Sequence, residues 1–471
     1  MATDPLYAEV ADPGSLARFG EDIAAADPSD WPGYPEQLRR TRIAAGTRHA
    51  VTTGVATVGG EACVLAGFEF GFLGGSMGAA EGARVVRAFS VAVAERLPIV
   101  CVAASGGSRM QEGTSALLQM QAVATAIAAA RRAGIPHIAV AGDPTTGGVW
   151  SSLIADADVL ISVPGARVSF SGSRTRPPGA DPRSPEYLAE GKWARGFVDV
   201  LSPVPGLRAT VAAAVRLLSP RSRGDGPRRA PLPAWPGGDS AGPAPPDAPP
   251  DEDAWTHVGR ARGPSRPRAD RWLAGYFGPT VEIRGDRCGG VDTGLRCGFG
   301  RHQGSTIGYI AQAGRRTTPA GFRTATRLLG LAARLRLPVL TLIDTPGAAA
   351  APADEAAGLG PAIAELFVAM ASSPVPVTSV IIGEGVSGGA LALASPSDLW
   401  IARDGYLAVT TPELAASILK LGVQDIPHVA TWLRLTPAEL MSRGIVRGII
   451  EPSAAQVGTA GQVPGSASAP R

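Results

Sequence analysis

The sequence predicts an α/β fold made of two tandem copies of one domain, related by an internal duplication. The first observation is a long repeat: residues 97–107 and 337–347 both open on Leu-Pro, continue as an apolar run and end in a glycine turn. The second is that helix-like, alanine-rich segments follow such turns, which is the strand–turn–helix order of layered α/β proteins. The offset of 240 positions far exceeds the period of a solenoid repeat, roughly 20–50 residues, so it indicates duplicated domains.

The elements of the first copy follow from its residue pattern. β-Branched and apolar residues make residues 51–58 and 62–72 two strands, and Gly59-Gly60 between them supplies a hairpin turn. Glycines in residues 74–78 then break the pattern. The expected elements after this break are a helix to about Arg96, a strand at residues 99–104 and an alanine-rich helix through Arg132.

Composition divides the chain into five parts. Residues 220–254 are crowded with Pro, Gly, Arg and Asp, a composition that buries too little apolar surface to order itself and is typical of a linker. The tail is rich in Ala, Gly and Ser. The predicted parts are a lead-in at residues 1–50, a first domain at 51–219, the linker at 220–254, a second domain at 255–452 and a flexible tail at 453–471.

The overall composition excludes several classes of partner. The chain is 45% hydrophobic and 18% charged with a net charge of +3, so neither global disorder nor a nucleic-acid partner is predicted. Its four cysteines form no Cys-x-x-Cys pair, so no zinc is expected. The start lacks the pattern of a signal peptide, and no stretch of about 18 residues is uniformly apolar. We therefore expect a cytoplasmic protein with no membrane partner.

Glycine turns are the candidate catalytic elements. Backbone N–H groups at a turn between a strand and a helix can bind a developing negative charge, and glycine lets a substrate approach the backbone. For any single Gly-Gly pair, tight packing is the better explanation. Four such turns at matched positions in two halves favour oxyanion holes instead. The candidate residues are Gly106, Gly107, Gly147, Gly148, Gly347, Gly388, Gly389 and Ala390.

Conventional catalytic side chains are poorly supplied. The five histidines are scattered, and neither Ser105 nor Ser387 lies in a Gly-x-Ser-x-Gly elbow, so a Ser-His-Asp hydrolase is not predicted. Arg109 lies near the first-half turns, where it meets either a phosphate or solvent. Three carboxylates at strand ends are acids, bases or caps of the following turn: Asp143, Asp344 and Glu384.

Long motifs in both halves resemble one known family. In the first half, residues 68–78 (FEFGFLGGSMG), 104–113 (ASGGSRMQEG) and 143–148 (DPTTGG) resemble the β subunit of acetyl-CoA carboxylase carboxyltransferase. In the second half, residues 343–348 (IDTPGA), 382–391 (IGEGVSGGAL) and 411–420 (TPELAASILK) resemble its α subunit. The chain is therefore similar to a β–α fusion, with the linker as the joint.

This resemblance implies two crotonase-like (ClpP/crotonase) domains and an acyl-CoA carboxyltransferase. The first domain would receive the acyl-CoA, with Gly106, Gly107, Gly147 and Gly148 holding the thioester enolate. The second would receive carboxybiotin from a separate carrier protein, with Gly347, Gly388, Gly389 and Ala390 holding the ureido oxygen. Three further residues would contact these groups: Ser105, Arg109 and Ser387. A biotin carboxylase, a biotin carboxyl carrier protein and further copies of the chain, in a homo-oligomer, are the implied partners.

The sequence also departs from the family pattern, mainly on the biotin side. The four-cysteine zinc ribbon is absent, a His-Gln-Lys-Gly-Arg-Asp-like stretch becomes residues 311–316 (AQAGRR), and alanines at 349–351 replace an aromatic residue. Two alternatives therefore stay open beside the carboxyltransferase: a biotin-independent acyl-thioester decarboxylase and a non-catalytic scaffold subunit. Lysine occurs only at Lys192 and Lys420, neither in a Met-Lys-Met-like context, so the chain should carry no biotin of its own.

Overall fold

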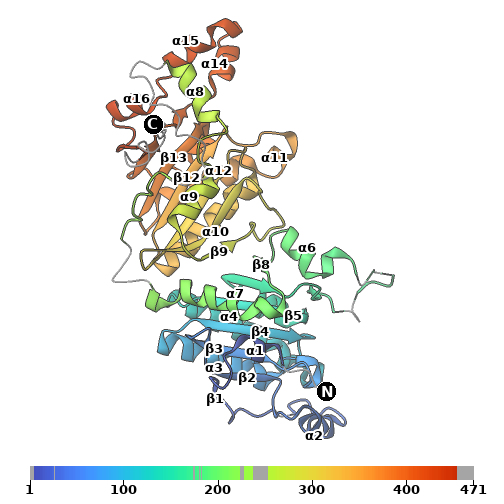
Figure 1. The fold of residues 1–471 in the computed structure, drawn as a ribbon. Coiled ribbons are helices and arrows are strands. Elements are labelled where there is room, and N and C mark those ends of the chain that lie inside the picture. Colours follow the sequence, from blue (N-terminus) through green and yellow to red (C-terminus); the bar gives the residue numbers. More distant parts are fainter. Residues whose placement is uncertain are drawn as a thin grey trace, which may run out of the picture.

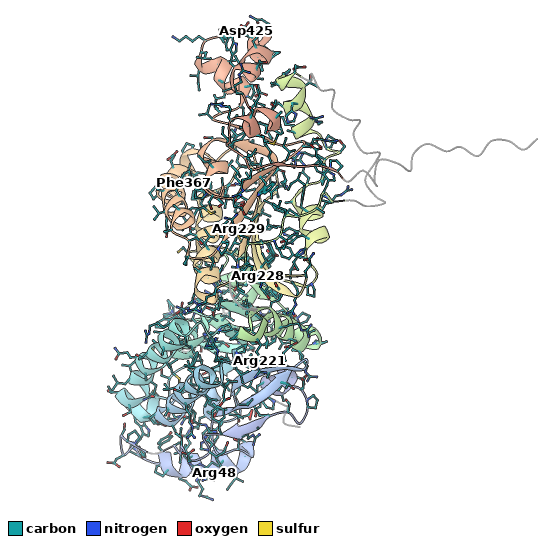
Figure 2. All side chains as sticks on the ribbon, turned by 90° about the vertical axis from the view of Figure 1, so that its left-hand side faces the viewer. Arg48, Arg221, Arg228, Arg229, Phe367 and Asp425 are labelled. Carbon is teal, nitrogen blue, oxygen red and sulfur yellow. The ribbon has the colours of Figure 1, made fainter. Side chains whose placement is uncertain are left out.

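The structure is a computed structural model in which two α/β halves are stacked end to end (Figure 1). It describes residues 5–25, 27–172, 176–179, 181, 183–222, 228–236 and 253–452. Arg48 of the first half and Asp425 of the second lie at opposite ends of the molecule (Figure 2). The predicted tail at 453–471, and residues 223–227 and 237–252 of the predicted linker, lie outside the described residues.

The first half contains an eight-stranded sheet of order β1-β2-β3-β4-β5-β6-β8, with β7 paired to β5. Strands β1 to β3 are antiparallel and the others are parallel. The strands are β1 Ala17–Phe19, β2 Val51–Val58, β3 Glu61–Phe68, β4 Ile99–Ser105, β5 His137–Thr146, β6 Val159–Ser162, β7 Val168–Ser169 and β8 Val200–Leu201. The helices are α1 Leu6–Val10, α2 Tyr34–Ala45, η1 Leu73–Gly75, α3 Ala79–Glu95, η2 Met110–Glu112, α4 Gly113–Arg132, α5 Gly147–Val149, η3 Trp150–Ile154, η4 Pro185–Tyr187, α6 Ala189–Ala194, α7 Val204–Leu218 and η5 Pro220–Ser222.

The second half repeats this architecture with the order β16-β14-β13-β12-β11-β10-β9, and β15 pairs with β13. The strands are β9 Thr280–Ile283, β10 Leu295–His302, β11 Ser305–Gln312, β12 Val339–Thr345, β13 Val377–Val386, β14 Leu399–Ala402, β15 Tyr406–Ala408 and β16 Ile449–Ile450. The helices are α8 Ala254–Arg262, α9 Ala269–Tyr276, α10 Pro319–Leu335, α11 Pro352–Ala356, α12 Leu359–Ala371, α13 Ser387–Leu391, α14 Pro412–Ile418, η6 Val423–Asp425, α15 Ile426–Trp432 and α16 Pro437–Ser442.

The predicted elements of the first copy are confirmed, with one difference. The hairpin forms as β2 and β3, the helix to about Arg96 is α3, the strand at 99–104 is β4 and the helix through Arg132 is α4. The second strand ends at Phe68 instead of Phe72. The chain turns there because the Phe72 N–H donates to the Glu69 carbonyl at 3.0 Å.

The offset of 240 positions between the two copies also holds for whole helices and strands. Helices α3 and α10 begin and end 240 positions apart, as do the strand pairs β4 and β12, β5 and β13, and β6 and β14. Two isolated bridges, Met77 to Ser108 and Thr317 to Ala348, keep the same offset. In the sequence, the pairs Gly147-Gly148 and Gly388-Gly389 lie 241 positions apart, a slip of one residue from the offset of 240. The strand ends remove that slip and place Ser387 at the position of Gly147.

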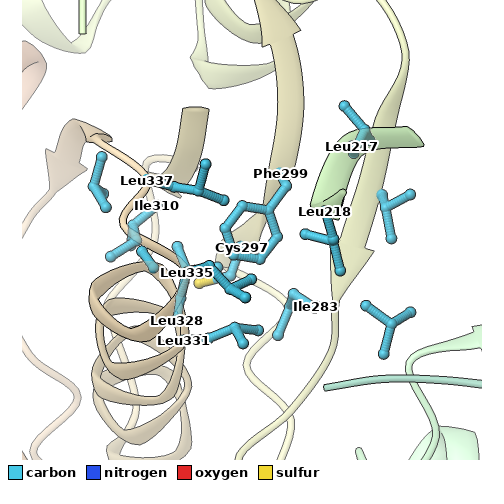
Figure 3. Close-up of a cluster of buried hydrophobic side chains, with 14 of the residues drawn as sticks. Leu217, Leu218, Ile283, Cys297, Phe299, Ile310, Leu328, Leu331, Leu335 and Leu337 are labelled. Atoms are coloured by element: carbon cyan, nitrogen blue, oxygen red, sulfur yellow. The ribbon is translucent and has the colours of Figure 1, made fainter. Parts of the chain in front are cut away.

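The two halves share an apolar core. Helix α7 of the first half packs against β9 and β10 of the second, and Leu217 and Leu218 lie beside Ile283 and Phe299 (Figure 3). Each of these four side chains is nearly or fully buried. Burial of apolar surface is the main stabilising contribution to such an interface, so the halves form one body.

Arginine and aspartate side chains close the edge of this interface. The buried Asp199 carboxylate binds Arg287 at 2.6 Å and Arg327 at 3.1 Å, and Asp158 binds Arg334. Asp199 and Asp158 come from the first half, and the three arginines from the second. Burial alone would raise the pKa of Asp199, but the two guanidinium groups outweigh it and lower that pKa.

Part of the predicted linker is ordered against the second half. Ala230 is buried and its carbonyl accepts from Thr378 Oγ1 at 3.2 Å, while Trp235 packs edge-on against Trp272. The lead-in also joins the first half, because β1 pairs with β2 and Tyr7 of α1 is buried in the core. Composition alone missed these contacts, because single apolar residues such as Ala230 and Trp235 can anchor a proline-rich segment when the folded domain supplies apolar neighbours.

Candidate active site

The first glycine turn lies where β4 and β5 end side by side. These strands are parallel neighbours, with Ser105 opposite Thr145, so the turns that follow them meet at one edge of the sheet. A Cβ added to Gly107 would lie 3.2 Å from the Gly147 Cα, and the two residues have φ values of +108° and +60°. The approach is too close for side chains, and the structure thus brings Gly106, Gly107, Gly147 and Gly148 together.

Three of these four amides are already hydrogen-bonded. The Gly106 N–H donates to the Gly74 carbonyl at 2.9 Å, that of Gly147 to the Phe170 carbonyl at 3.0 Å, and that of Gly107 to Ser105 Oγ at 3.1 Å. Within the described residues, the amides of Gly148 and Ser108 have no acceptor.

Gly148 and Ser108 are neighbours in space. A Cβ on Gly148 would lie 2.5 Å from Ser108 Oγ and 3.1 Å from the sulfur of Met120. The two amides without an acceptor therefore come from one small region, as an oxyanion hole requires. Sequence reasoning missed Ser108. The signal was available, because Ser108 directly follows Gly107 in the motif at residues 104–113.

The second turn is built in the same way from the ends of β12 and β13. Thr345 Oγ1 accepts from the Gly347 N–H at 3.1 Å, and Gly347 has a φ of +120°. A Cβ on Gly389 would lie 2.5 Å from the Ala348 nitrogen, so the two turns touch through backbone. In the described part of the chain, the amides of Ala348, Gly388 and Gly389 have no acceptor.

The remaining residues expected at the second turn have different surroundings. Ala390 is fully buried in the core that the two halves share. Ser387 is exposed and has a φ of +62°, a left-handed conformation that is strained for a residue with a side chain. The equivalent Gly147 has nearly the same φ, so this backbone shape belongs to the fold and not to the residue.

Ser105 and Arg109 are buried and structural in their contacts. Ser105 Oγ donates to the Gly75 carbonyl at 2.6 Å and holds the Gly107 amide. The Arg109 guanidinium binds Glu81 at 2.9 Å and Glu112 at 3.0 Å, and all three side chains are at most 1% exposed. Burial alone would lower the pKa of Arg109, but the Glu81 charge outweighs it. This arginine therefore faces the protein interior instead of a phosphate.

The three strand-end carboxylates are each held by an arginine. Asp143 binds Arg167 at 2.8 Å, Asp344 binds Arg266 at 2.6 Å and Glu384 binds Arg262 at 2.8 Å. Burial would raise the pKa of Asp143, but Arg167 outweighs it and lowers that pKa. Because each of these carboxylates is held in an ion pair with an arginine, backbone donors carry the chemistry of this site better than these side chains do.

A cavity of about 480 Å³ lies at the strand ends of the first half. Ala104 and Asp143, which precede the two turns, line it together with Phe70 and Glu69. Burial raises the pKa of the Glu69 carboxyl. Leu6 of α1 closes the cavity on another side. The space is large enough for part of a small organic ligand and adjoins the segment that carries the first turn.

No group of three or more His, Cys, Asp or Glu side chains among the described residues is placed to hold a metal ion. None of the helices in the described ranges is long and apolar enough to cross a membrane.

Comparison with known proteins identifies the family of the chain. The family "Carboxyl transferase domain" matches residues 15–175, and "Acetyl co-enzyme A carboxylase carboxyltransferase-like" matches residues 251–462. The acetyl-coenzyme A carboxylase carboxyl transferase subunits beta/alpha of Salinispora arenicola is 39% identical over 95% of this chain and 82% of its own length. The chain belongs to the acetyl-CoA carboxylase carboxyltransferase family. This membership confirms the predicted β–α order and the prediction that the chain is an enzyme of the carboxyltransferase class.

Other carboxyltransferases extend the comparison. A probable biotin-dependent acyl-coenzyme A carboxylase beta3 subunit of Mycobacterium bovis is 32% identical over 96% of this chain and 89% of its own length. Among solved structures, transcarboxylase 12S aligns with a TM-score of 0.76 over 99% of this chain and 91% of that one, at 19% identity. A single-chain long-chain acyl-CoA carboxylase aligns with a TM-score of 0.73 over 96% of this chain and 44% of that one, at 20% identity. These structures confirm the predicted fold of two tandem crotonase-like domains.

Proposed function

We propose that this chain is the carboxyltransferase component of a biotin-dependent acyl-CoA carboxylase. It would move a carboxyl group from carboxybiotin, on a separate carrier protein, to acetyl-CoA or a related acyl-CoA, giving malonyl-CoA or its homologue for fatty acid biosynthesis. The observation that carries the proposal is the pair of matched glycine turns, each with adjacent backbone amides that lack an acceptor. Two oxyanions arise in such a transfer, one on each reactant, and each turn supplies donors for one of them.

In the first half, the amides of Ser108 and Gly148 would bind the thioester oxygen as it becomes an enolate. Gly106, Gly107 and Gly147 would hold those two donors in place through their own hydrogen bonds. Ser105 and Arg109 would not contact the substrate. Both would hold the turn in place through hydrogen bonds inside the protein. The neighbouring cavity, lined by Phe70 and Ala104, would take part of the acyl-CoA.

In the second half, the amides of Ala348, Gly388 and Gly389 would bind the ureido oxygen of biotin. Carboxybiotin supplies the carboxyl group and a base for the α-proton of the thioester. Gly347 shapes the turn, Ala390 anchors it in the core, and Ser387 lies at its exposed rim. These amides fit a neutral or anionic oxygen because none of them has another acceptor in the described part of the chain.

A second copy of the chain is expected to complete the site. Every hydrogen bond of the described turn residues stays within its own half. Exposed apolar side chains cluster around α14 and α15, at the end that Asp425 marks in Figure 2. They include Ile418, Val423 and Trp432, which are 66%, 81% and 63% exposed. Such a surface favours burial against another copy, so that the second turn of one chain faces the first turn of its partner.

The remaining partners follow from what this chain cannot supply. Neither Lys192 nor Lys420 lies in a biotin-attachment context, and no phosphate-binding Gly-x-x-x-x-Gly-Lys-Ser/Thr loop occurs. We therefore include a biotin carboxyl carrier protein and a biotin carboxylase as partners, with the cytoplasm as the compartment. Nucleic acid and membrane are not part of the proposal.

The test is malonyl-CoA decarboxylation with and without added biotin, which runs the transfer backwards. Gly148→Val should impair every thioester reaction, and Gly389→Val should remove only the biotin-dependent rate, each by about 10²–10³ because an oxyanion donor is lost. Gly360→Val is the matched control, since a Cβ there meets nothing within 4 Å.

Three outcomes would contradict the proposal. Gly389→Val that retains full activity, with Gly148→Val inactive, would indicate a biotin-independent decarboxylase. Folded variants that both keep full activity would reduce the glycines to packing residues. A chain that binds no acyl thioester would be a scaffold subunit.

A further inference from the structure

Arg316 places a guanidinium group directly on the second turn. Its Nη1 donates to the Ala348 carbonyl at 3.2 Å, and a Cβ added to Gly347 would lie 3.5 Å from the same nitrogen. The next residue, Thr317, forms the backbone bridge to Ala348 that attaches this segment to the turn. The side chain of Arg316 is otherwise exposed. Its charge therefore lies at the open rim of the candidate biotin site.

The charge of Arg316 is paired with no carboxylate in the described part of the chain. The neighbouring arginines differ: Arg266 and Arg268 both bind the buried Asp344. An arginine has five N–H donors in a planar fork, and Arg316 uses only one of its nitrogens on Ala348. Its remaining donors are available to an anion.

The first turn shows that the fold does not require this charge. The bridge between Met77 and Ser108 matches the bridge between Thr317 and Ala348, so Ser76 occupies the position of Arg316. Ser76 is neutral, and its Oγ accepts from the buried Arg109 at 3.2 Å. The first turn thus has a serine at its rim. The second turn has a guanidinium group that binds a carbonyl but no carboxylate of the described residues. Because the backbone is the same, the difference points to a ligand.

We propose that Arg316 recognises the carboxylate that is being transferred. This inference rests on the proposed function. It adds a carboxylate to the oxyanion that the second turn would bind. The guanidinium fork matches the two oxygens of a carboxylate and forms charge-assisted hydrogen bonds with it. That carboxylate belongs to carboxybiotin before the transfer and to the malonyl-type thioester after it. On carboxybiotin the carboxylate lies next to the ureido oxygen, which the second-turn amides would bind. On the malonyl-type thioester it lies one carbon from the thioester carbonyl, whose oxygen the first-turn amides of the partner copy would bind.

The experiment compares the binding of malonyl-CoA and acetyl-CoA, which differ by one carboxylate, to the full chain by equilibrium titration. Arg316→Ala should weaken malonyl-CoA binding about tenfold or more, as expected for a lost hydrogen bond to a charged group, and leave acetyl-CoA binding unchanged. Arg316→Lys should restore part of the difference. Arg315→Ala is the matched control, because the exposed Arg315 side chain lies against Gly294 and only its backbone carbonyl, which the substitution keeps, bonds to Thr345 of the turn.

A second measurement separates the two sources of the carboxylate. It is the rate of biotin-dependent malonyl-CoA decarboxylation at saturating thioester. A loss of rate in Arg316→Ala with unchanged malonyl-CoA binding assigns the contact to the biotin side, whereas a loss of binding assigns it to the thioester. Unchanged binding and unchanged rate would overturn the inference. A wild-type chain that binds neither thioester would overturn the proposed function itself, so the two failures are distinguishable.

Discussion

The two glycine turns have similar backbone conformations, but the arginine beside each turn differs in burial and in ion pairing. In the first half, Arg109 is buried and its charge is paired with Glu81 and Glu112. In the second half, Arg316 is exposed on the turn itself without a carboxylate partner in the described residues. The duplicated fold therefore fixes where the backbone amides lie, whereas the charge at the rim of each turn depends on single residues.

The strain is also distributed differently. Gly147 and Ser387 occupy equivalent left-handed positions, with φ values of +60° and +62°. Glycine adopts this conformation freely, and serine does so at a cost of about 1–2 kcal/mol. The second turn keeps a hydroxyl at its exposed rim despite this cost. A strained residue that persists at a candidate site is typical of functional positions.

The largest expected effect is the difference in stability between variants of Arg109 and Arg316. Arg109→Ala leaves the buried Glu81 and Glu112 without their partner, and removing one member of a buried ion pair costs about 3–5 kcal/mol of stability. Arg316→Ala, at an exposed position, should change stability by no more than about 0.5 kcal/mol. Urea unfolding of both variants measures the difference. Equal stabilities would show that Arg109 is not a structural residue.

An intermediate effect on stability is expected at the backbone contact between Gly389 and Ala348 in the second turn. Gly389→Ala places a Cβ 2.5 Å from the Ala348 nitrogen, so the turn must shift, and we expect a cost of about 1–3 kcal/mol. Gly388→Ala places its Cβ in open space and should leave stability unchanged. Thermal unfolding of the two variants, side by side, is the measurement. If Gly388→Ala lowered the unfolding temperature more than Gly389→Ala, the two turns would not touch through Gly389.

The smallest effect concerns the left-handed position. Ser387→Gly relieves strain but frees the unfolded chain, so we expect stabilisation of at most about 1 kcal/mol. Gly147→Ser should be destabilising by more than that, because its Cβ would also lie 3.2 Å from the Gly107 Cα. Denaturant midpoints of the two variants test this asymmetry. Effects of the same size and opposite sign would show that strain alone, without the contact to Gly107, decides both positions.

The duplication, the strand–turn–helix order and the places where glycine turns follow strands can all be predicted from the amino-acid sequence. These features depend on local residue types: apolar runs form β4 and β12, and glycines end them. That the two turns of each half meet follows from the observed sheets, in which β4 and β5, and likewise β12 and β13, are parallel neighbours that end at one edge. Family motifs carried the rest of the prediction, and the comparisons confirm the family.

Which hydrogen-bonding and charged groups at those turns are available to a ligand depends on contacts between segments distant in the sequence. The Gly106 and Gly147 amides bond to carbonyls of Gly74 and Phe170, which lie more than 20 positions away in sequence, so the free donors shift to Ser108 and Gly148. Arg109 becomes structural because α3 brings Glu81 to it. Arg316 gains its role because Thr317 bridges to Ala348. A local pattern records what a residue is, whereas its free hydrogen bonds and charge depend on partners that only folding brings into contact.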